Sequence, residues 1–251
     1  MTLEILTSDA LTPLRHGFFT RRGGASSGVF QGLNCGPGSS DQSEIVAINR
    51  GRVAQAMQTE PEHLITVHQV HSATVAHVTG PLADKPRADG IVTATPGLAL
   101  SVLTADCQPV LFADLNAGVI GAAHAGWRGA LDGVLEATVD AMEGLGANRA
   151  DIRAVIGPTI SQRAYEVGPE FLAEFLSDDP ETARFFAQGN GDRMLFDLPG
   201  FGLHRLRVAG VGHAEWTRHC TYSDPERFFS YRRSTHAGEA DYGRLIASIR
   251  L

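Results

Sequence analysis

The strongest constraint on the fold is a run of short apolar segments in the first half of the chain. The segments are rich in Val, Ile, Leu and Thr, and Gly, Pro or Asp separates most of them. Aliphatic and β-branched runs bounded by turn residues are typical of β-strands. They cover residues 64–67, 74–78, 90–93, 98–103, 109–114 and 119–124. We therefore predict a sheet built largely from consecutive strands.

Helices are expected on both sides of this run. Asp41 followed by Glu44 resembles a capping box, and apolar residues at near-helical spacing extend it to a helix over 42–59. A similar pattern predicts a helix over 129–145, which the nearby glycines end. The remaining expected elements are a strand at 151–156, one or two helices within 169–188 and a closing strand at 245–251.

Helices that flank a strand run without regular alternation predict an α+β fold, with a mixed β-sheet core and flanking helices. The sequence contains no internal repeat and no low-complexity linker. We therefore expect residues 1–251 to form a single domain.

Charge and hydropathy exclude several classes of protein. The chain has 21 Lys+Arg against 28 Asp+Glu, a formal net charge of −7, whereas nucleic-acid binding rests on a basic face. The uncharged, strongly apolar stretch over residues 90–105 contains Pro96 and is shorter than the about 20 residues that a membrane span needs. Glu4 and Asp9 interrupt any apolar run at the N-terminus, so no export signal is indicated. We expect a cytoplasmic protein that binds neither nucleic acid nor membrane, as a monomer or a homodimer.

The chemistry-bearing residues concentrate between His68 and Gly129. His71, Cys107 and His124 each follow or end a predicted strand, so they can meet at one edge of a sheet. Two imidazole nitrogens and one thiolate form a zinc site that leaves a fourth position open for catalysis. Asp106, beside Cys107, is a candidate to orient a ligand or to act as a base.

The residues alone leave other interpretations open. His68 is an alternative ligand to His71, and on a strand the two would face opposite ways. Cys107 is either a buried apolar side chain or a nucleophile activated by a histidine, as in a metal-free cysteine hydrolase. A pocket that only binds ligands is a third interpretation.

Two arginines are candidate anion ligands. Arg21 lies beside a glycine-rich turn, and Arg128 immediately precedes a predicted helix, where backbone N–H groups favour anions. A later basic cluster consists of Arg232, Arg233 and Arg244.

Several motifs together resemble the YfiH-like family, whose members are also described as laccase-domain or multicopper polyphenol oxidase proteins. The most specific are T-A-D-C-Q-P-V-L (104–111) and A-A-H-A-G-W-R-G (122–129). The others are 18–28, 32–36, 68–71, 88–93, 156–160, 165–168, 228–233 and 243–244, so the resemblance covers nearly the whole chain.

The resemblance implies an α+β fold similar to that of a toxin deamidase with a Cys-His pair. It implies a zinc enzyme that phosphorolyses adenosine, guanosine, inosine and methylthioadenosine and deaminates adenosine. Copper-dependent polyphenol oxidation and editing of peptidoglycan precursors are alternative activities proposed for the family. Members often carry extra cysteines where Thr159 and Ser161 stand here, which makes copper the less favoured metal.

Residue by residue, the resemblance places the metal ligands at His71, Cys107 and His124. Cys107, Asp106 and His68 are then the candidate catalytic residues. Arg21, Asn34 and Arg128, which lie in or beside the matched stretches, are the candidate ligands of nucleoside and phosphate.

Overall fold

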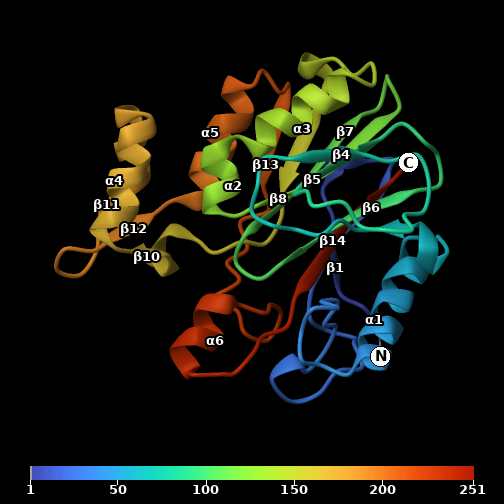
Figure 1. Cartoon of the computed structure of the whole chain (residues 1–251), viewed down its shortest axis with the longest axis horizontal. Helices are drawn as coiled ribbons and strands as arrows, with labels where there is room; N and C mark the ends of the chain where they lie inside the picture. Colours follow the sequence, from blue (N-terminus) through green and yellow to red (C-terminus); the bar gives the residue numbers. More distant parts are fainter. Residues whose placement is uncertain (1) are drawn as a thin grey trace.

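The computed structural model describes residues 2–251, in which two β-sheets stack face to face between layers of helices (Figure 1). The first sheet has five strands in the order β1 (Ile5–Leu6), β2 (Arg15–Phe19), β14 (Leu245–Arg250), β6 (Ala99–Thr104) and β3 (Leu64–Ile65). Helix α1 (Ser43–Ala56) covers its outer face through Val53 and Ala54. The chain's last strand thus pairs with one of its first.

The second sheet has six strands and is mixed. Its order is β13 (His213–Trp216), β9 (Arg153–Ile156), β7 (Gln108–Asp114), β8 (Val119–Ala125), β5 (Gly90–Thr93) and β4 (Val75–His77). The two edge strands pair in parallel with their neighbours, and the inner pairs are antiparallel. Helices α2 (Trp127–Asp132), α3 (Val134–Glu143) and α5 (Leu198–Val208) pack against this sheet, as Figure 1 shows.

Successive side chains of the buried strands point to opposite faces of the sheet and so contribute to two hydrophobic cores. In β7, Val110 and Phe112 face the helices, whereas Leu111 and Ala113 face the other sheet. All residues of β7 and β8 are buried, as expected for strands covered on both faces. The inter-sheet core therefore runs the length of β8 and ends where β8 ends.

A small lobe projects from these layers (Figure 1, yellow to orange). It contains α4 (Pro169–Asp178) and a three-stranded sheet of β10 (Glu166–Val167), β12 (Met194–Phe196) and β11 (Phe186–Gln188). Phe171, Phe175 and Phe196 hold it together through close aromatic contacts. Helix α6 (Tyr231–Ala237) lies below the lobe in the view of Figure 1, and Arg232 of this helix donates to the Glu166 carbonyl of β10.

The α+β class with a mixed sheet core and flanking helices is confirmed. The helix predicted over 129–145 is in fact two helices, because Gly133 adopts a left-handed backbone conformation (φ 94°) between them. The strands also divide into two stacked sheets, which no single-strand pattern indicated. None of the helices in the described chain combines the length and the apolar character needed to cross a membrane.

Candidate metal centre between two cavities

His124 reaches the edge of the inter-sheet core from strand β8. It follows Ile120 and Ala122 on the face that packs against the other sheet, and its side chain is 4% exposed. Its Nδ1 lies 2.8 Å from Oδ1 of Asp89, a fully buried carboxylate. This contact leaves Nε2 as the ring nitrogen available to a metal.

The same carboxylate holds the loop that carries His71. Oδ2 of Asp89 accepts hydrogen bonds from the backbone N–H groups of Val70 (3.1 Å) and Ser72 (2.7 Å), and from the Ser72 hydroxyl. Burial opposes ionisation of Asp89, but the bonds from His124, Ser72 and Val70 lower its pKa to about 2. One ionised carboxylate therefore positions both histidines.

Only His124 of the three predicted ligands lies in a strand. His71 lies in the loop between β3 and β4 with a left-handed backbone (φ 60°), and Cys107 lies in the turn that crosses from β6 to β7. The expectation that all three sit at strand ends was therefore wrong in detail. The crossing from one sheet to the other brings them together instead.

The three ligand atoms lie within 4.8 Å of one another. Cys107 Sγ is 3.9 Å from His71 Nε2, and the two imidazole rings meet edge to face at a centroid distance of 4.7 Å. Tetrahedral zinc with two nitrogens and one sulfur places its ligand atoms about 3.5 Å apart. The donor set, its spacing and the carboxylate behind His124 fit a zinc ion, and they leave one coordination position open.

The thiol and the imidazole stabilise each other's charged forms. Burial opposes the Cys107 thiolate, but the neighbouring His124 and then His71 lower the Cys107 pKa to about 6. Burial likewise opposes the His124 cation, while Cys107 and Asp89 raise the His124 pKa to about 9. The thiolate form that a metal needs is therefore already favoured near neutral pH.

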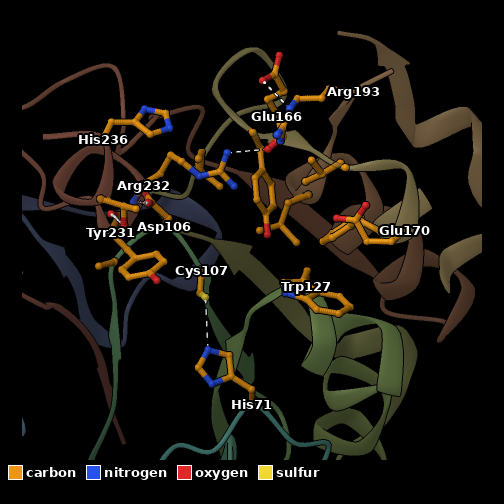
Figure 2. Close-up of a pocket in the computed structure, with 18 residues that line it drawn as sticks. His71, Asp106, Cys107, Trp127, Glu166, Glu170, Arg193, Tyr231, Arg232 and His236 are labelled. Carbon is orange, nitrogen blue, oxygen red and sulfur yellow. Dashed lines mark hydrogen bonds and ion pairs between the residues drawn. The ribbon is translucent and has the colours of Figure 1, made fainter. Parts of the chain in front are cut away.

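Two cavities meet at this centre and share only His71, Ala105 and Cys107 as lining residues. The first, about 560 Å³, runs toward the lobe and α6; we call it the aromatic cavity. In Figure 2, Cys107 and His71 lie at one end of it, with Trp127 and Tyr231 on opposite sides. Tyr165 and Phe171 also line it, together with the carboxylates of Asp106, Glu166 and Glu170 and the guanidinium groups of Arg193 and Arg232.

The second cavity, about 320 Å³, opens between the 36–38 loop, the 66–71 loop and the segment that leads into β14. We call it the basic cavity, because Lys85 and Arg244 line it and none of its lining residues is Asp or Glu. His68 is exposed and lines this cavity, as does His124. The 66–71 segment is not a strand, so His68 and His71 contribute to the same cavity instead of facing opposite ways.

Asp106 has a different position from the one its sequence neighbourhood indicated. Its carboxylate accepts hydrogen bonds from the hydroxyls of Thr221 and Ser230 (2.5 and 2.9 Å) and from Arg232 N (2.7 Å), and it orients neither histidine. Burial raises its pKa, against the effect of these bonds. Asp89 orients His124 instead, and its signal in the sequence was the A-D-G motif at 88–90.

The three predicted ligands of nucleoside and phosphate lie outside both cavities. Arg21 bonds to the carbonyls of Gln31 and Pro225 in a separate cavity, and Arg128 pairs with Glu174 on the surface. The buried Asn34 side chain bonds to Ser39, Asp41 and the backbone of Gly36 and Arg244. Asn34 therefore lies behind the basic cavity and holds two of its lining residues, Gly36 and Arg244, in position.

Fold and site together define an α+β protein with a His-Cys-His group that could hold a metal ion, at the junction of two cavities. The family model described as "Multi-copper polyphenol oxidoreductase laccase" matches residues 15–251. This chain belongs to that family, the YfiH-like laccase-domain proteins.

Similar proteins cover almost the whole chain. A purine nucleoside phosphorylase named ORF3 from Streptomyces griseus is 41% identical over 242 residues, which is 95% of this chain and 96% of that one. The purine nucleoside phosphorylase YfiH of Escherichia coli K12 is 40% identical and covers 87% of this chain and 88% of its own. The crystal structure of Neisseria meningitidis protein NMB0706 superposes with a TM-score of 0.90 at 35% identity, and covers 100% and 99% of the two chains.

Proposed function

We propose that this protein is a zinc-dependent purine nucleoside phosphorylase. The observation that carries the proposal is the convergence of His71, Cys107 and His124 at the end of a cavity lined by aromatic side chains. The names of the similar proteins from Streptomyces griseus and Escherichia coli support the same reaction class. Trp127 and Tyr165 offer flat apolar surfaces for a purine, and the carboxylates nearby suit the ribose hydroxyls.

Phosphorolysis breaks the bond between ribose C1′ and the purine nitrogen and forms a bond from C1′ to a phosphate oxygen. Positive charge develops at C1′ in the transition state, and the departing purine takes up negative charge or a proton. Bound zinc would supply a Lewis acid at this junction. The protein's own part is to align nucleoside and phosphate across the junction and to exclude water from C1′.

Two candidate catalytic residues receive distinct roles. We assign proton transfer to the His68 imidazole, which is exposed to the basic cavity. Asp106 positions the start of α6 through Ser230 and Arg232, and thereby Tyr231 and Arg232 at the cavity wall.

The same site suits the other purine nucleosides. Adenosine, guanosine, inosine and methylthioadenosine share the purine and the ribose that the aromatic cavity would hold. Adenosine deamination at this site is part of the proposal, since zinc held by His71, Cys107 and His124 would supply the water activation that this reaction requires.

The test is an assay of inosine cleavage with and without phosphate. We expect the wild-type protein, purified with about one zinc per chain, to form hypoxanthine and ribose 1-phosphate only when phosphate is present. His71→Ala, Cys107→Ala and His124→Ala should each abolish the reaction. Full activity in Cys107→Ala would refute the proposal.

One observation favours a second candidate, a metal-free cysteine hydrolase or amidase. Cys107, His124 and Asp89 follow one another in space in the order of a nucleophile, its base and an orienting carboxylate, and the Cys107 pKa is lowered. In that case chelation leaves the activity intact and thiol alkylation abolishes it. A polyphenol oxidase is less favoured, because a multicopper centre needs several more ligands than the one group found in residues 2–251.

A further inference from the structure

The two cavities that meet at the metal centre differ in charge. The acidic residues that line the aromatic cavity are Glu166, Glu170 and the hydrogen-bonded Asp106, against the basic residues Arg193 and Arg232. The basic cavity has Lys85 and Arg244 and no carboxylate. An anion that must reach the centre therefore meets an excess of cationic lining residues on one side only.

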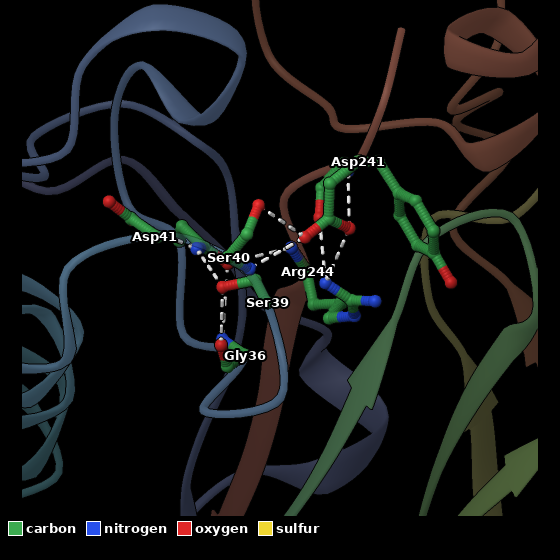
Figure 3. Close-up of polar contacts among 8 residues, drawn as sticks. Gly36, Ser39, Ser40, Asp41, Asp241 and Arg244 are labelled. Atoms are coloured by element: carbon green, nitrogen blue, oxygen red, sulfur yellow. Dashed lines mark hydrogen bonds and ion pairs between the residues drawn. The ribbon is translucent and has the colours of Figure 1, made fainter.

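Arg244 is held in place by a dedicated network, shown in Figure 3. Its Nη1 donates to Asp241 Oδ1 (3.3 Å) and to the Tyr242 carbonyl (2.8 Å), while Asp241 is itself anchored by the N–H of Ser40 (2.6 Å). Within residues 2–251, Nε and Nη2 of Arg244 have no hydrogen-bond acceptor. The guanidinium is thus fixed by one edge, with donors left for a ligand.

The loop at Gly36 is shaped around this arginine. A Cβ at Gly36 would overlap the Arg244 side chain, so only glycine leaves room for it. Asn34 ties the same loop to the Arg244 backbone, with its Oδ1 accepting from Gly36 N (3.1 Å) and Arg244 N (2.9 Å). This is why Asn34 matters to the cavity without lining it.

Lys85 completes the cationic side. In the described part of the chain no carboxylate lies within 4.0 Å of the Lys85 ammonium or of the neighbouring Arg50 guanidinium. Arg50 binds Thr66, a lining residue, from behind (3.3 Å). Lys85 is an exposed residue, but partial burial and then the charge of Arg50 lower its pKa, an electrostatic cost that a bound anion would relieve.

We propose that the basic cavity is the binding site for inorganic phosphate, with Lys85 and Arg244 as its cationic ligands. The inference rests on the proposed phosphorolysis and adds a division of labour: the nucleoside occupies the aromatic cavity, and phosphate reaches C1′ from the other side of the metal centre. It also replaces Arg21 and Arg128, which lie outside both cavities, as the phosphate ligands.

Lys85→Gln is the most direct test. Lys85 lies on an exposed loop without a hydrogen bond or ion pair to the described residues, so the variant should fold normally. We expect its KM for phosphate to rise about tenfold or more, with the KM for inosine unchanged. Isothermal titration calorimetry with inorganic phosphate, which needs no turnover, should show the same loss of affinity.

Two further variants serve as controls. Lys85→Arg keeps the charge and should restore most of the phosphate affinity. Arg22→Gln removes a charge from the separate cavity that contains Arg21, and should leave the phosphate KM unchanged. Adenosine 5′-monophosphate is the second probe in the calorimetry, because the phosphate group of a nucleotide has the same chemistry as inorganic phosphate and could be the natural occupant of the cavity.

The outcomes separate this inference from the proposed function. If the wild-type protein binds phosphate in a Lys85-dependent manner but cleaves no nucleoside, the phosphate site stands and the phosphorylase proposal fails. If phosphorolysis occurs and Lys85→Gln keeps the wild-type KM and affinity for phosphate, the phosphate site is overturned. It is also overturned if Lys85→Gln weakens only the binding of adenosine 5′-monophosphate.

Discussion

At the scale of single residues, Asp89 holds the candidate site together. Its two carboxylate oxygens serve different ligands, one through the His124 ring and one through the backbone on both sides of His71. We expect Asp89→Asn to weaken zinc binding about 10–100-fold, because the charge that orients both ligands is lost. Competition with a chromophoric chelator measures this directly.

Asp106→Asn is the matched control for that substitution. Asp106 is also buried and fully hydrogen-bonded, but to Thr221, Ser230 and Arg232. The Asp106→Asn substitution should lower the melting temperature of the protein and leave its zinc affinity within about twofold of the wild-type value. Equal losses of zinc affinity in the two variants would contradict the role given to Asp89.

The thiol of Cys107 gives a prediction about pH. The pKa of an unperturbed cysteine thiol is about 8.5, whereas the Cys107 pKa is about 6. In zinc-free protein, alkylation of Cys107 by iodoacetamide should be nearly constant from pH 7 to 8 and fall about tenfold per unit below pH 6, since only the thiolate reacts. Mass spectrometry of the labelled peptide follows the rate, and a rate that still climbs between pH 7 and 9 would contradict the assignment.

The sequence indicated the three candidate ligands, which the structure brings together, but it could not assign their hydrogen-bond partners. Residue types and motifs singled out His71, Cys107 and His124 because a metal site needs particular donor atoms. Which carboxylate lies behind His124 depends on how β5 and β8 pair. Gly90 pairs with Ala123, which places the preceding residue, Asp89, beside His124, and this pairing cannot be read from the sequence alone. The nearer carboxylate in sequence, Asp106, was therefore the wrong one to orient a ligand.

At the scale of elements, the entry to α2 controls the room around the metal ligands. Gly126 is the N-cap of α2 with an ordinary backbone conformation (φ −67°), so alanine is sterically allowed by the backbone. A Cβ there would lie 2.9 Å from Cys107 Sγ and 3.0 Å from His71 Cδ2. Gly126→Ala should therefore reduce zinc affinity, measured by the same chelator competition, with only a small change in secondary structure by circular dichroism.

Gly51→Ala tests whether this effect belongs to the site. Gly51 lies within α1 and an added Cβ there would meet nothing within 4 Å. The substitution should stabilise the protein by about 0.5–1 kcal/mol, as expected for a glycine in a helix, and leave zinc binding unchanged. Loss of zinc in both glycine variants would point to a general effect on the fold.

Element boundaries were predictable where local chemistry decides them. Strands β5 to β8 and helix α1 fall close to their predicted ranges, because apolar runs and turn residues mark them. The lobe strands β10, β11 and β12 have only two or three residues each and were not predicted, since such short segments depend on their partners. Asp41 does not cap α1 as its motif indicated: Gln42 is the N-cap, and Asp41 binds Ser26 and Asn34.

At the scale of the whole molecule, the metal would link parts of the chain that the sheets alone hold only indirectly. The three ligands come from the loop before β4, the crossing between the sheets and strand β8. Removal of zinc should lower the melting temperature by about 5–15 °C, because the ion binds only the folded chain. In Cys107→Ala the same treatment should change it by less than about 2 °C, and equal shifts in both proteins would contradict the ligand set.

The stacking of two sheets was beyond sequence patterns for a related reason. Residues of β7 alternate between two cores that are both apolar, so its sequence shows one continuous hydrophobic run. Such a run indicates burial on both faces but not what lies on each side. The junction of two cavities, which depends on that stacking, could only be found in three dimensions.

A centre reached through two separate openings has a kinetic consequence. If the proposed phosphorolysis holds the nucleoside in the aromatic cavity and phosphate in the basic cavity, neither reactant has to pass the place of the other, so each can arrive first and each product can leave by its own route. Initial-rate plots should then intersect, in the manner of a random sequential mechanism, and each reactant should act as a substrate without blocking entry of the other even at high concentration.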